Sequence, residues 1–200
     1  MSRENSITNV VFCGVGGQGI IVASDILSDV ALSAGFDVKK SEVHGMAQRG
    51  GSVISQVRFG EKVYSPLISK GGADIIVAFE KLEALRYLDY LRPGGSIFIN
   101  DQEIIPLTVF SGEIEYPKNI AERCRTSGAD VFPVQGIQIA EVLGNSRALN
   151  VVMLGALSGC LDFSDKQWLE AIRKRIPAKY HELNENAFLA GKKAKEPRHD

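Results

Sequence analysis

The chain has 200 residues, a length that suits one well-buried domain, and no shift in composition marks a boundary between two. Hydrophobic residues make up 44% and charged residues 24%, which excludes a disordered or fibrous protein. Lysine and arginine number 23 against 24 acidic residues, so no net field favours nucleic acid or an anionic membrane as a partner.

The first residues are polar and carry neither the apolar stretch nor the cleavage site of a secretory signal. No run approaches the roughly 18 apolar residues that a membrane span needs. We therefore expect a cytoplasmic protein without a membrane partner. The cysteines, Cys13, Cys124 and Cys160, are far apart, which excludes a disulfide framework and the close pairs typical of zinc or iron–sulfur sites. We expect no metal site in this chain.

A glycine cluster separates a predicted strand at residues 7–12 from a helical pattern at residues 20–34. Three of its residues match G-x-G-x-x-G and two neighbours complete the turn: Gly14, Gly16 and Gly19, with Gly17 and Gln18. The free N–H groups at a helix start carry partial positive charge, so such a turn can hold a phosphate without a basic side chain. The same glycines also serve α/β folds in which they only shape a turn, and the pattern leaves both roles open.

A dinucleotide site also needs an acidic residue about 20 positions further on, at the end of the second strand. The second strand is predicted at residues 35–39, and Glu42 is the only acid nearby. It comes late, which disfavours ordinary use of NAD.

The chain after the second strand alternates between predicted strands and helices. Residues 41–52 are predicted to be a loop. Residues 52–65 predict a β-hairpin, with strands at 52–59 and 63–65 around a turn at 60–62. The apolar run at 73–79 predicts a central strand covered on both faces, followed by a helix to Leu91 and a strand at 96–100.

The last third of the chain has less periodicity between residues 101 and 117 and then becomes regular again. Ser164 and Gln167 predict a capping box before a helix at 168–176. The other predicted elements are helices at 118–127, 135–143, 148–160 and about 179–191, with a strand at 130–134. We predict a single domain over residues 1–191 with a polar tail at 192–200. Its fold class is α/β, with a Rossmann-like, mostly parallel sheet, helices on both faces and the β-hairpin as an insertion.

A second glycine-rich segment, residues 44–51, contains His44, Gln48 and Arg49. Histidine can carry a proton near neutral pH, arginine can clamp a carboxylate or phosphate, and glutamine can both donate and accept. These three residues are our candidate catalytic group. The alternative is that His44 and Arg49 tie the loop to its own backbone.

The two glycine-rich segments together resemble the gamma-type subunit of thiamine-dependent 2-oxoacid:ferredoxin oxidoreductases, with indolepyruvate-type members closest in pattern. Residues 150–157 resemble a later helix motif of that family, and the likeness covers about residues 7–190. The resemblance implies a complex that oxidatively decarboxylates a 2-oxoacid, joins the acyl group to coenzyme A and passes two electrons to ferredoxin. It also implies a Rossmann-like fold.

The resemblance further implies that thiamine diphosphate and the iron–sulfur clusters sit on a larger catalytic partner chain, with none bound by this chain alone. On this interpretation Gly14, Gly16, Gly17, Gln18 and Gly19 form an anion-holding, cofactor-binding turn. His44, Gln48 and Arg49 then face the partner's active site or coenzyme A, the co-substrate. Made alone, such a subunit is expected to expose an apolar patch and self-associate as a homodimer.

Two rival functions are compatible with the residues alone. A stand-alone nucleotide-binding or phosphate-binding regulatory module would use the turn without catalysis. A structural scaffold between catalytic chains would respond to mutation of either segment in assembly but not in kinetics.

Overall fold

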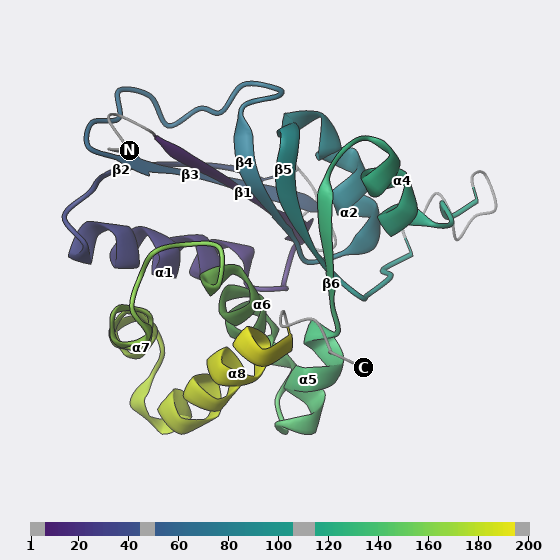
Figure 1. Ribbon diagram of the computed structural model, residues 1–200. Coiled ribbons are helices and arrows are strands. Elements are labelled where there is room, and N and C mark those ends of the chain that lie inside the picture. The colour runs from purple at the N-terminus through teal and green to yellow at the C-terminus, as the bar shows by residue number, and fades with distance from the viewer. Residues whose placement is uncertain (1–6, 45–50, 106–114, 195–200) are drawn as a thin grey trace.

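The computed structural model describes residues 7–44, 51–105 and 115–194 (Figure 1). Within them, six strands form one sheet in the order β2-β3-β1-β4-β5-β6. The strands are β1 (Thr8–Val15), β2 (Asp37–His44), β3 (Ser52–Gly60), β4 (Ala73–Ala78), β5 (Leu91–Asn100) and β6 (Asp130–Val134). The pairs β1–β4, β4–β5 and β5–β6 are parallel, whereas β3 is antiparallel to both β1 and β2. The predicted α/β class with a mostly parallel sheet is confirmed.

Helices cover both faces of the sheet, as predicted (Figure 1). One face carries α1 (Ile20–Ser33), α5 (Gly136–Val142), α6 (Leu149–Ser158), α7 (Asp165–Arg175) and α8 (His181–Ala194). The other carries α2 (Lys81–Arg86) and α4 (Ile120–Thr126). Short 3-10 turns complete the chain: η1 (Leu88–Tyr90), η2 (Ser146–Ala148) and η3 (Ala178–Tyr180).

Alternation along the central strands divides the core into two layers, because successive strand side chains point to opposite faces. Phe12 of β1 and Val77 of β4 pack with α1 and α6 in the larger layer, which also contains Trp168 of α7. Val11 and Ile76, their neighbours in sequence, pack with α2 and α4 in the smaller layer. The central strand β4 is thus buried on both faces, as its apolar run predicts.

The β-hairpin differs from the predicted one. Its two strands are β2 and β3, which pair from Asp37 with Gly60 to His44 with Val53. Residues 63–65 do not form a strand, so the predicted hairpin over residues 52–65 is wrong. Side chains bind this segment instead: Asp37 accepts the N–H of Val63 (2.9 Å), and Arg58 donates to the carbonyl of Ser65 (2.9 Å).

Several other predicted boundaries also move, and β5 begins at Leu91 rather than at residue 96. The second strand runs from Asp37 to His44 and not over residues 35–39, because β3 pairs with it along its whole length and draws residues 41–44 out of the predicted loop. The helix predicted to end at Leu91 ends at Arg86, and a 3-10 turn leads into β5. The capping box at Ser164 and Gln167 is confirmed at the start of α7.

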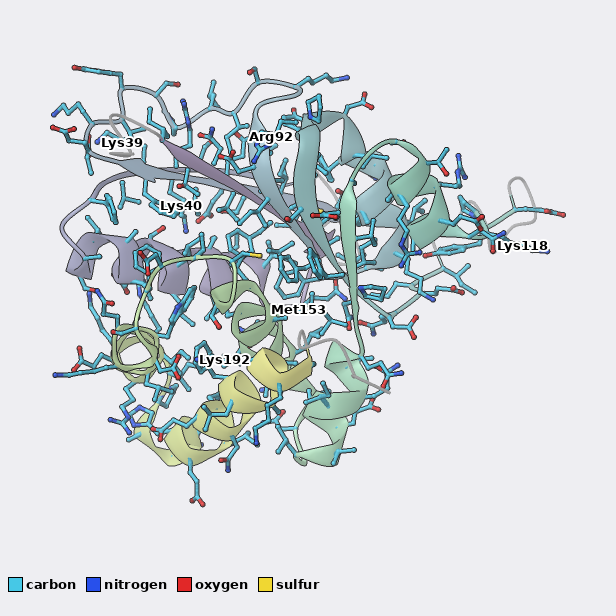
Figure 2. All side chains as sticks on the ribbon, in the orientation of Figure 1. Lys39, Lys40, Arg92, Lys118, Met153 and Lys192 are labelled. Atoms are coloured by element: carbon cyan, nitrogen blue, oxygen red, sulfur yellow. The ribbon has the colours of Figure 1, made fainter. Side chains whose placement is uncertain are left out.

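Helices α6 and α8 pack with their backbones almost in contact. A Cβ atom placed on Gly155 of α6 would lie 2.1 Å from the carbonyl oxygen of Phe188, and one on Gly191 of α8 would lie 2.0 Å from that of Val152. No residue larger than glycine fits at either position without moving a helix. Met153 of α6, labelled in Figure 2, lies in the layer between α6 and the sheet.

A charge network joins α1 to β2 and α7. Lys40 of β2 contacts Asp25 of α1, and Figure 2 shows Lys40 on the α1 side of the sheet. Asp29 of α1, which is buried, accepts hydrogen bonds from Lys174 (3.1 Å) and Arg175 (2.5 Å) of α7. Within the described residues, no helix combines the length and apolar composition needed to cross a bilayer.

Candidate functional site

The glycine turn lies at the carboxyl edge of the sheet, between β1 and α1, where open α/β sheets place their ligands. The antiparallel course of β3 brings the other glycine-rich segment to the same edge. Val15 at the end of β1 pairs with Ser52 at the start of β3, and the N–H of Gly16 donates to the carbonyl of Gly51 (2.9 Å). The two glycine-rich segments therefore adjoin through main-chain contacts.

Of the three candidate catalytic residues, the structure describes only the backbone of His44. The backbone of His44 ends β2 and pairs with Val53, one residue beyond Ser52. It thus belongs to the same sheet edge as the glycine turn. Gln48 and Arg49 lie outside the described residues, as does the side chain of His44, so their roles stay predictions.

The side chain of Gln18 closes the turn from the inside. Its Oε1 accepts the N–H of Val15 (2.8 Å), while its Nε2 donates to the carbonyl of Phe79 (2.8 Å) and to Oε1 of Gln102 (2.9 Å). These bonds connect the ends of β1, β4 and β5. The structure thus gives the Gln18 amide partners within the protein, in a position that shapes the turn.

The glycines of the turn face different surroundings. A Cβ on Gly14 would lie 2.7 Å from Oε1 of Gln18, and one on Gly19 would lie 2.8 Å from Nδ2 of Asn150. These two glycines therefore make room for amide side chains. Gly16 and Gly17 are exposed, and a Cβ on Gly17 would meet nothing within 4 Å, although its φ of 105° favours glycine.

The first turn of α1 leaves main-chain donors available. Gly19 is its N-cap, in the left-handed conformation (φ 80°, ψ 24°), and no side chain in the described chain caps it. The N–H groups of residues 20–22 have no carbonyl four residues earlier within the helix, as at every helix start. Because α1 has 14 residues, the positive end of its dipole adds to these donors.

Asn100 at the end of β5 extends the amide network to α5. Its Nδ2 donates to the carbonyl of Phe79 (2.9 Å) and to Oε1 of Gln102 (3.1 Å), and its Oδ1 accepts the N–H of Ile137 (3.1 Å). The side chain is fully buried. Asn100 and Gln102 therefore support Gln18, and through it the turn.

Two buried carboxylates stand behind this edge, at the start of α2. Glu80 accepts hydrogen bonds from the N–H groups of Glu83 (3.0 Å) and Ile104 (3.1 Å) and from the hydroxyl of Tyr116 (2.5 Å). Glu83 accepts a hydrogen bond from Ser52 and pairs with Arg86 at 3.0 Å. Burial raises the pKa of Glu83, while Ser52 and Arg86 oppose that rise.

A cavity of about 710 Å³ opens further along the same edge, beside β5 and β6. Its wall includes Tyr116, Lys118 and Arg125, and Figure 2 shows Lys118 beyond α4. Lys81 lines it too, paired with Asp101 at 2.6 Å and Glu103 at 3.1 Å. The hydrogen bond that Lys81 donates to Asp101 raises the pKa of Lys81, so its ammonium stays charged and paired.

The described residues contain no group of three or more histidine, cysteine or acidic side chains placed to hold a metal ion. Cys13 and Cys124 are buried, and burial raises the pKa of both thiols, so neither is poised as a thiolate ligand or nucleophile. Cys160 is exposed. We also note that β3 separates β2 from β1, which places Glu42 one strand further from the turn than a dinucleotide site requires.

Sequence reasoning missed Asn100, Gln102, Glu80 and Asn150. Asn150 had a sequence signal, because it is an amide at the start of an otherwise apolar helix. The others carry no pattern, since each is a single polar residue at or just beyond the end of a strand. Only the sheet order brings Phe79, Asn100 and Gln18 together.

The fold and this edge define a Rossmann-like α/β protein with a glycine-rich turn at the carboxyl ends of its parallel strands. The family model for pyruvate ferredoxin/flavodoxin oxidoreductase matches residues 9–194. The chain belongs to this family, and it is a small subunit of a 2-oxoacid:ferredoxin oxidoreductase. The family resemblance stated from the two glycine-rich segments is thereby confirmed.

Named relatives agree with this assignment over nearly their full length. Indolepyruvate oxidoreductase subunit IorB of Thermococcus kodakarensis is 44% identical over 193 residues, covering 93% of this chain and 95% of the relative. The protein of the same name from Archaeoglobus fulgidus is 42% identical over 187 residues, covering 92% of each chain. The 2-oxoglutarate synthase subunit KorC of Methanothermobacter thermautotrophicus is 30% identical over 188 residues, covering 90% of each chain.

Solved structures share the fold. The gamma subunit of a keto/oxoacid ferredoxin oxidoreductase from Geobacter sulfurreducens has a TM-score of 0.71 at 22% identity, covering 94% of this chain and 98% of that one. A 2-oxoglutarate:ferredoxin oxidoreductase from Magnetococcus marinus has a TM-score of 0.75 at 23% identity. This chain is covered to 96% and spans 31% of that longer chain, whose structure contains 2-oxoglutarate, coenzyme A and succinyl-CoA.

Proposed function

We propose that this chain is the accessory subunit of an oxidoreductase for indolepyruvate or a related aryl-pyruvate. The observation that carries the substrate class is the difference in identity: 44% to an indolepyruvate oxidoreductase subunit against 30% to a 2-oxoglutarate synthase subunit. In the proposed reaction the 2-oxoacid loses carbon dioxide, its acyl group is joined to the thiol of coenzyme A, and two electrons pass to ferredoxin.

On this proposal a larger partner chain holds thiamine diphosphate and the iron–sulfur clusters, and the complex works in the cytoplasm. The cofactors supply the carbanion chemistry and electron transfer. This chain covers the active site and helps to receive coenzyme A. Burial raises the pKa of the Cys13 and Cys124 thiols, which fits a role in binding rather than in redox chemistry.

Residue roles follow from the shared sheet edge. The turn of Gly14, Gly16, Gly17, Gln18 and Gly19 holds an anionic group, with Gly16 and Gly17 exposed and the Gln18 amide bracing the turn from within. His44, Gln48 and Arg49 face the partner's active site or the acyl acceptor. The main-chain bond between Gly16 and Gly51 supports this role, because it keeps the two segments adjacent.

The test replaces Arg49 with alanine in the complex reconstituted with its partner and measures the KM for coenzyme A and kcat. We expect the KM to rise by tenfold or more, since a charge-assisted contact to phosphate or carboxylate is worth roughly 1.5–3 kcal/mol. Arg123→Ala, at an exposed position on α4, is the matched control and should leave both constants unchanged. An Arg49→Ala enzyme with wild-type constants would remove the loop from the mechanism.

The partner is tested by purification. An obligate subunit should co-elute with a larger chain that carries brown clusters, and mass spectrometry identifies that chain. A stand-alone regulatory module would instead elute as a monomer and bind nucleotide by itself. Family membership favours the subunit over both the stand-alone module and the scaffold.

A further inference from the structure

A second cavity, of about 700 Å³, lies at the amino-terminal edge of the parallel strands, the edge away from the glycine turn. Thr8 at the start of β1, Ile75 of β4 and Ser96 of β5 line it from the sheet. Phe163, in the connection from α6 to α7, lines it from the helical layer. None of the described residues that line it belongs to either glycine-rich segment, so the proposed function leaves this cavity without a role.

Three phenylalanines that contact one another form an aromatic wall of this cavity. The ring centroids of Phe36 and Phe59 are 5.8 Å apart, and that of Phe163 lies 6.1 Å and 5.6 Å from them. The Phe36 side chain is 39% exposed, so part of this aromatic surface faces water. The faces of aromatic rings carry negative electrostatic potential and attract cations.

The charged residues beside this wall are mostly acidic. Glu61, Asp74 and Asp162 line the cavity together with one cation, Arg92, which is labelled in Figure 2. Arg92 donates through Nε to Asp74 at 2.8 Å, so these two charges offset each other. Glu61 and Asp162 are exposed, and neither carboxylate forms an ion pair within the described chain. The cavity therefore combines an aromatic wall with two negative charges that no described residue neutralises.

The combination of these features selects one class of ligand. An anion would meet two unpaired carboxylates and a guanidinium that is already paired. A neutral ligand would leave both carboxylates unused. An ammonium ion that carries an apolar group matches both parts of the cavity, because its charge pairs with the carboxylates while its apolar group packs on the rings.

We propose that this cavity binds an organic ammonium ion, with Glu61 and Asp162 as its charge partners and the three phenylalanines as its apolar wall. This is a binding function beyond the proposed role in 2-oxoacid oxidation. It lies at the opposite edge of the sheet from the turn that the proposed function uses, and its test measures binding to the chain itself.

Two side chains of the wild type can report whether the cavity is occupied. Trp168, the only tryptophan of the sequence, is fully buried and contacts Phe163 in a T-shaped arrangement with centroids 6.2 Å apart. Cys160 lines the cavity and is exposed, whereas Cys13 and Cys124 are buried. A bound ligand should therefore change the emission of Trp168 and protect Cys160 from alkylation.

The first experiment titrates the full-length chain with 2-phenylethylamine, which is an ammonium ion near neutral pH. Tryptophan emission and calorimetry follow the binding. The matched probe is 3-phenylpropionate, which carries the same ring on a short chain that ends in the opposite charge. We expect saturable binding of the amine and at least tenfold weaker binding of the carboxylate. Equal affinity for the two probes, or no saturable binding of the amine, overturns the proposal.

The second experiment removes the two charges. Glu61→Gln combined with Asp162→Asn should weaken the amine by at least tenfold, because both charge partners are lost. Both positions are exposed, so the variant should fold as the wild type does. Glu141→Gln combined with Glu182→Gln makes the same change in net charge at exposed positions of α5 and α8 outside the cavity, and should leave the affinity unchanged. An equal affinity in the two double variants overturns the assignment of the charge partners.

Alkylation of the wild type tests the same site without a substitution. Saturating 2-phenylethylamine should slow the modification of Cys160 by iodoacetamide severalfold, as measured by mass spectrometry of the intact chain and its peptides. The same concentration of 3-phenylpropionate should leave the rate unchanged. An unprotected Cys160 at saturating amine would show that the amine binds outside this cavity, and the proposal would be wrong.

Discussion

The hydroxyl of Ser52 donates a hydrogen bond to the carboxylate of Glu83 and so ties the start of β3 to α2. The Tyr87 hydroxyl lies 3.1 Å from the same Ser52 oxygen. Because Ser52 follows the second glycine-rich segment directly, this contact anchors one end of that segment to a buried carboxylate. The contact places an ionisable group next to the candidate site.

Glu83 predicts a dependence of stability on pH. Burial raises its folded-state pKa, so the folded chain binds this proton more tightly than the unfolded chain does. Ionisation of Glu83 therefore destabilises the folded chain. Its contribution to the free energy of unfolding falls as pH rises from the ordinary glutamate pKa through the raised pKa. In Glu83→Gln this part of the pH dependence of the unfolding free energy should disappear, as measured by urea unfolding from about pH 4.5 to about pH 7.5. Glu61→Gln, at an exposed turn, should keep the wild-type slope, and an equal slope in Glu83→Gln would contradict the prediction.

The lowered pKa of Asp29 predicts the opposite dependence of folding stability on pH. Hydrogen bonds from Arg175, and then from Lys174, lower its pKa, so its contribution to stability is present above the ordinary aspartate pKa and is lost as pH falls. Asp29→Asn should cost about 1.5–3 kcal/mol near neutral pH, the range for hydrogen bonds to charged groups. The gap to the wild type should narrow as pH falls below about 4. Denaturant unfolding near neutral pH and below about pH 4 measures this difference in unfolding free energy. The control Asp162→Asn, at an exposed position, should match the wild type at both pH values. A difference for Asp29→Asn that stays constant with pH would contradict the prediction.

The hydrogen bonds of the Gln18 amide predict that its removal destabilises the folded chain. Gln18→Ala removes the acceptor for the Val15 N–H and the donor to Phe79, so we expect a loss of about 2 kcal/mol in unfolding free energy. Gln18→Glu should lose at least as much, because it turns a carboxylate oxygen toward the Phe79 carbonyl. Thermal or urea unfolding gives both values. Gln135→Ala is the control, because Gln135 is exposed and makes no side-chain cap hydrogen bond at the start of α5, and it should change stability by less than about 0.5 kcal/mol. An equal loss in both alanine variants would show that the amide network does not hold the turn.

The contact between α6 and α8 predicts a strong effect of one methyl group. Gly155→Ala would place its Cβ 2.1 Å from the carbonyl oxygen of Phe188, so the helices must separate. We expect a loss of at least about 3 kcal/mol, above the usual cost of overpacking. Asn186→Ala, exposed on α8, should be neutral or slightly stabilising because alanine favours helix. A normal melting temperature for Gly155→Ala would mean that the two helices tolerate wider spacing.

Local signals predicted much of the fold. The capping box at Ser164 and the apolar run of β4 contain their own physical causes within a few residues, and both are confirmed. The hairpin was misassigned because strand pairing depends on distant contacts: β3 pairs with β1 and β2, and side chains at Asp37 and Arg58 hold the segment that resembles its second strand.

The candidate site shows the same division. The glycine turn is readable in the sequence because a strand, glycines and a helix follow one another directly. Its supporting residues are not, since Gln18 and Asn100 meet only at the carbonyl of Phe79, through the order of β1, β4 and β5. Asn150 reaches Gly19 from another helix. No spacing rule connects positions that lie so far apart in the sequence.

The glycine-to-backbone contact of α6 and α8 has a consequence far from the helices themselves. Because no side chain separates the two backbones at Gly155 and Gly191, the position of α8 fixes the position of α6. Helix α6 carries Asn150 in its first turn. A change near the end of the chain that lifts α8 would therefore withdraw the amide from Gly19 without touching either glycine-rich segment. The packing behind the glycine turn should thus be sensitive to substitutions at Gly191, on the last helix of the described chain.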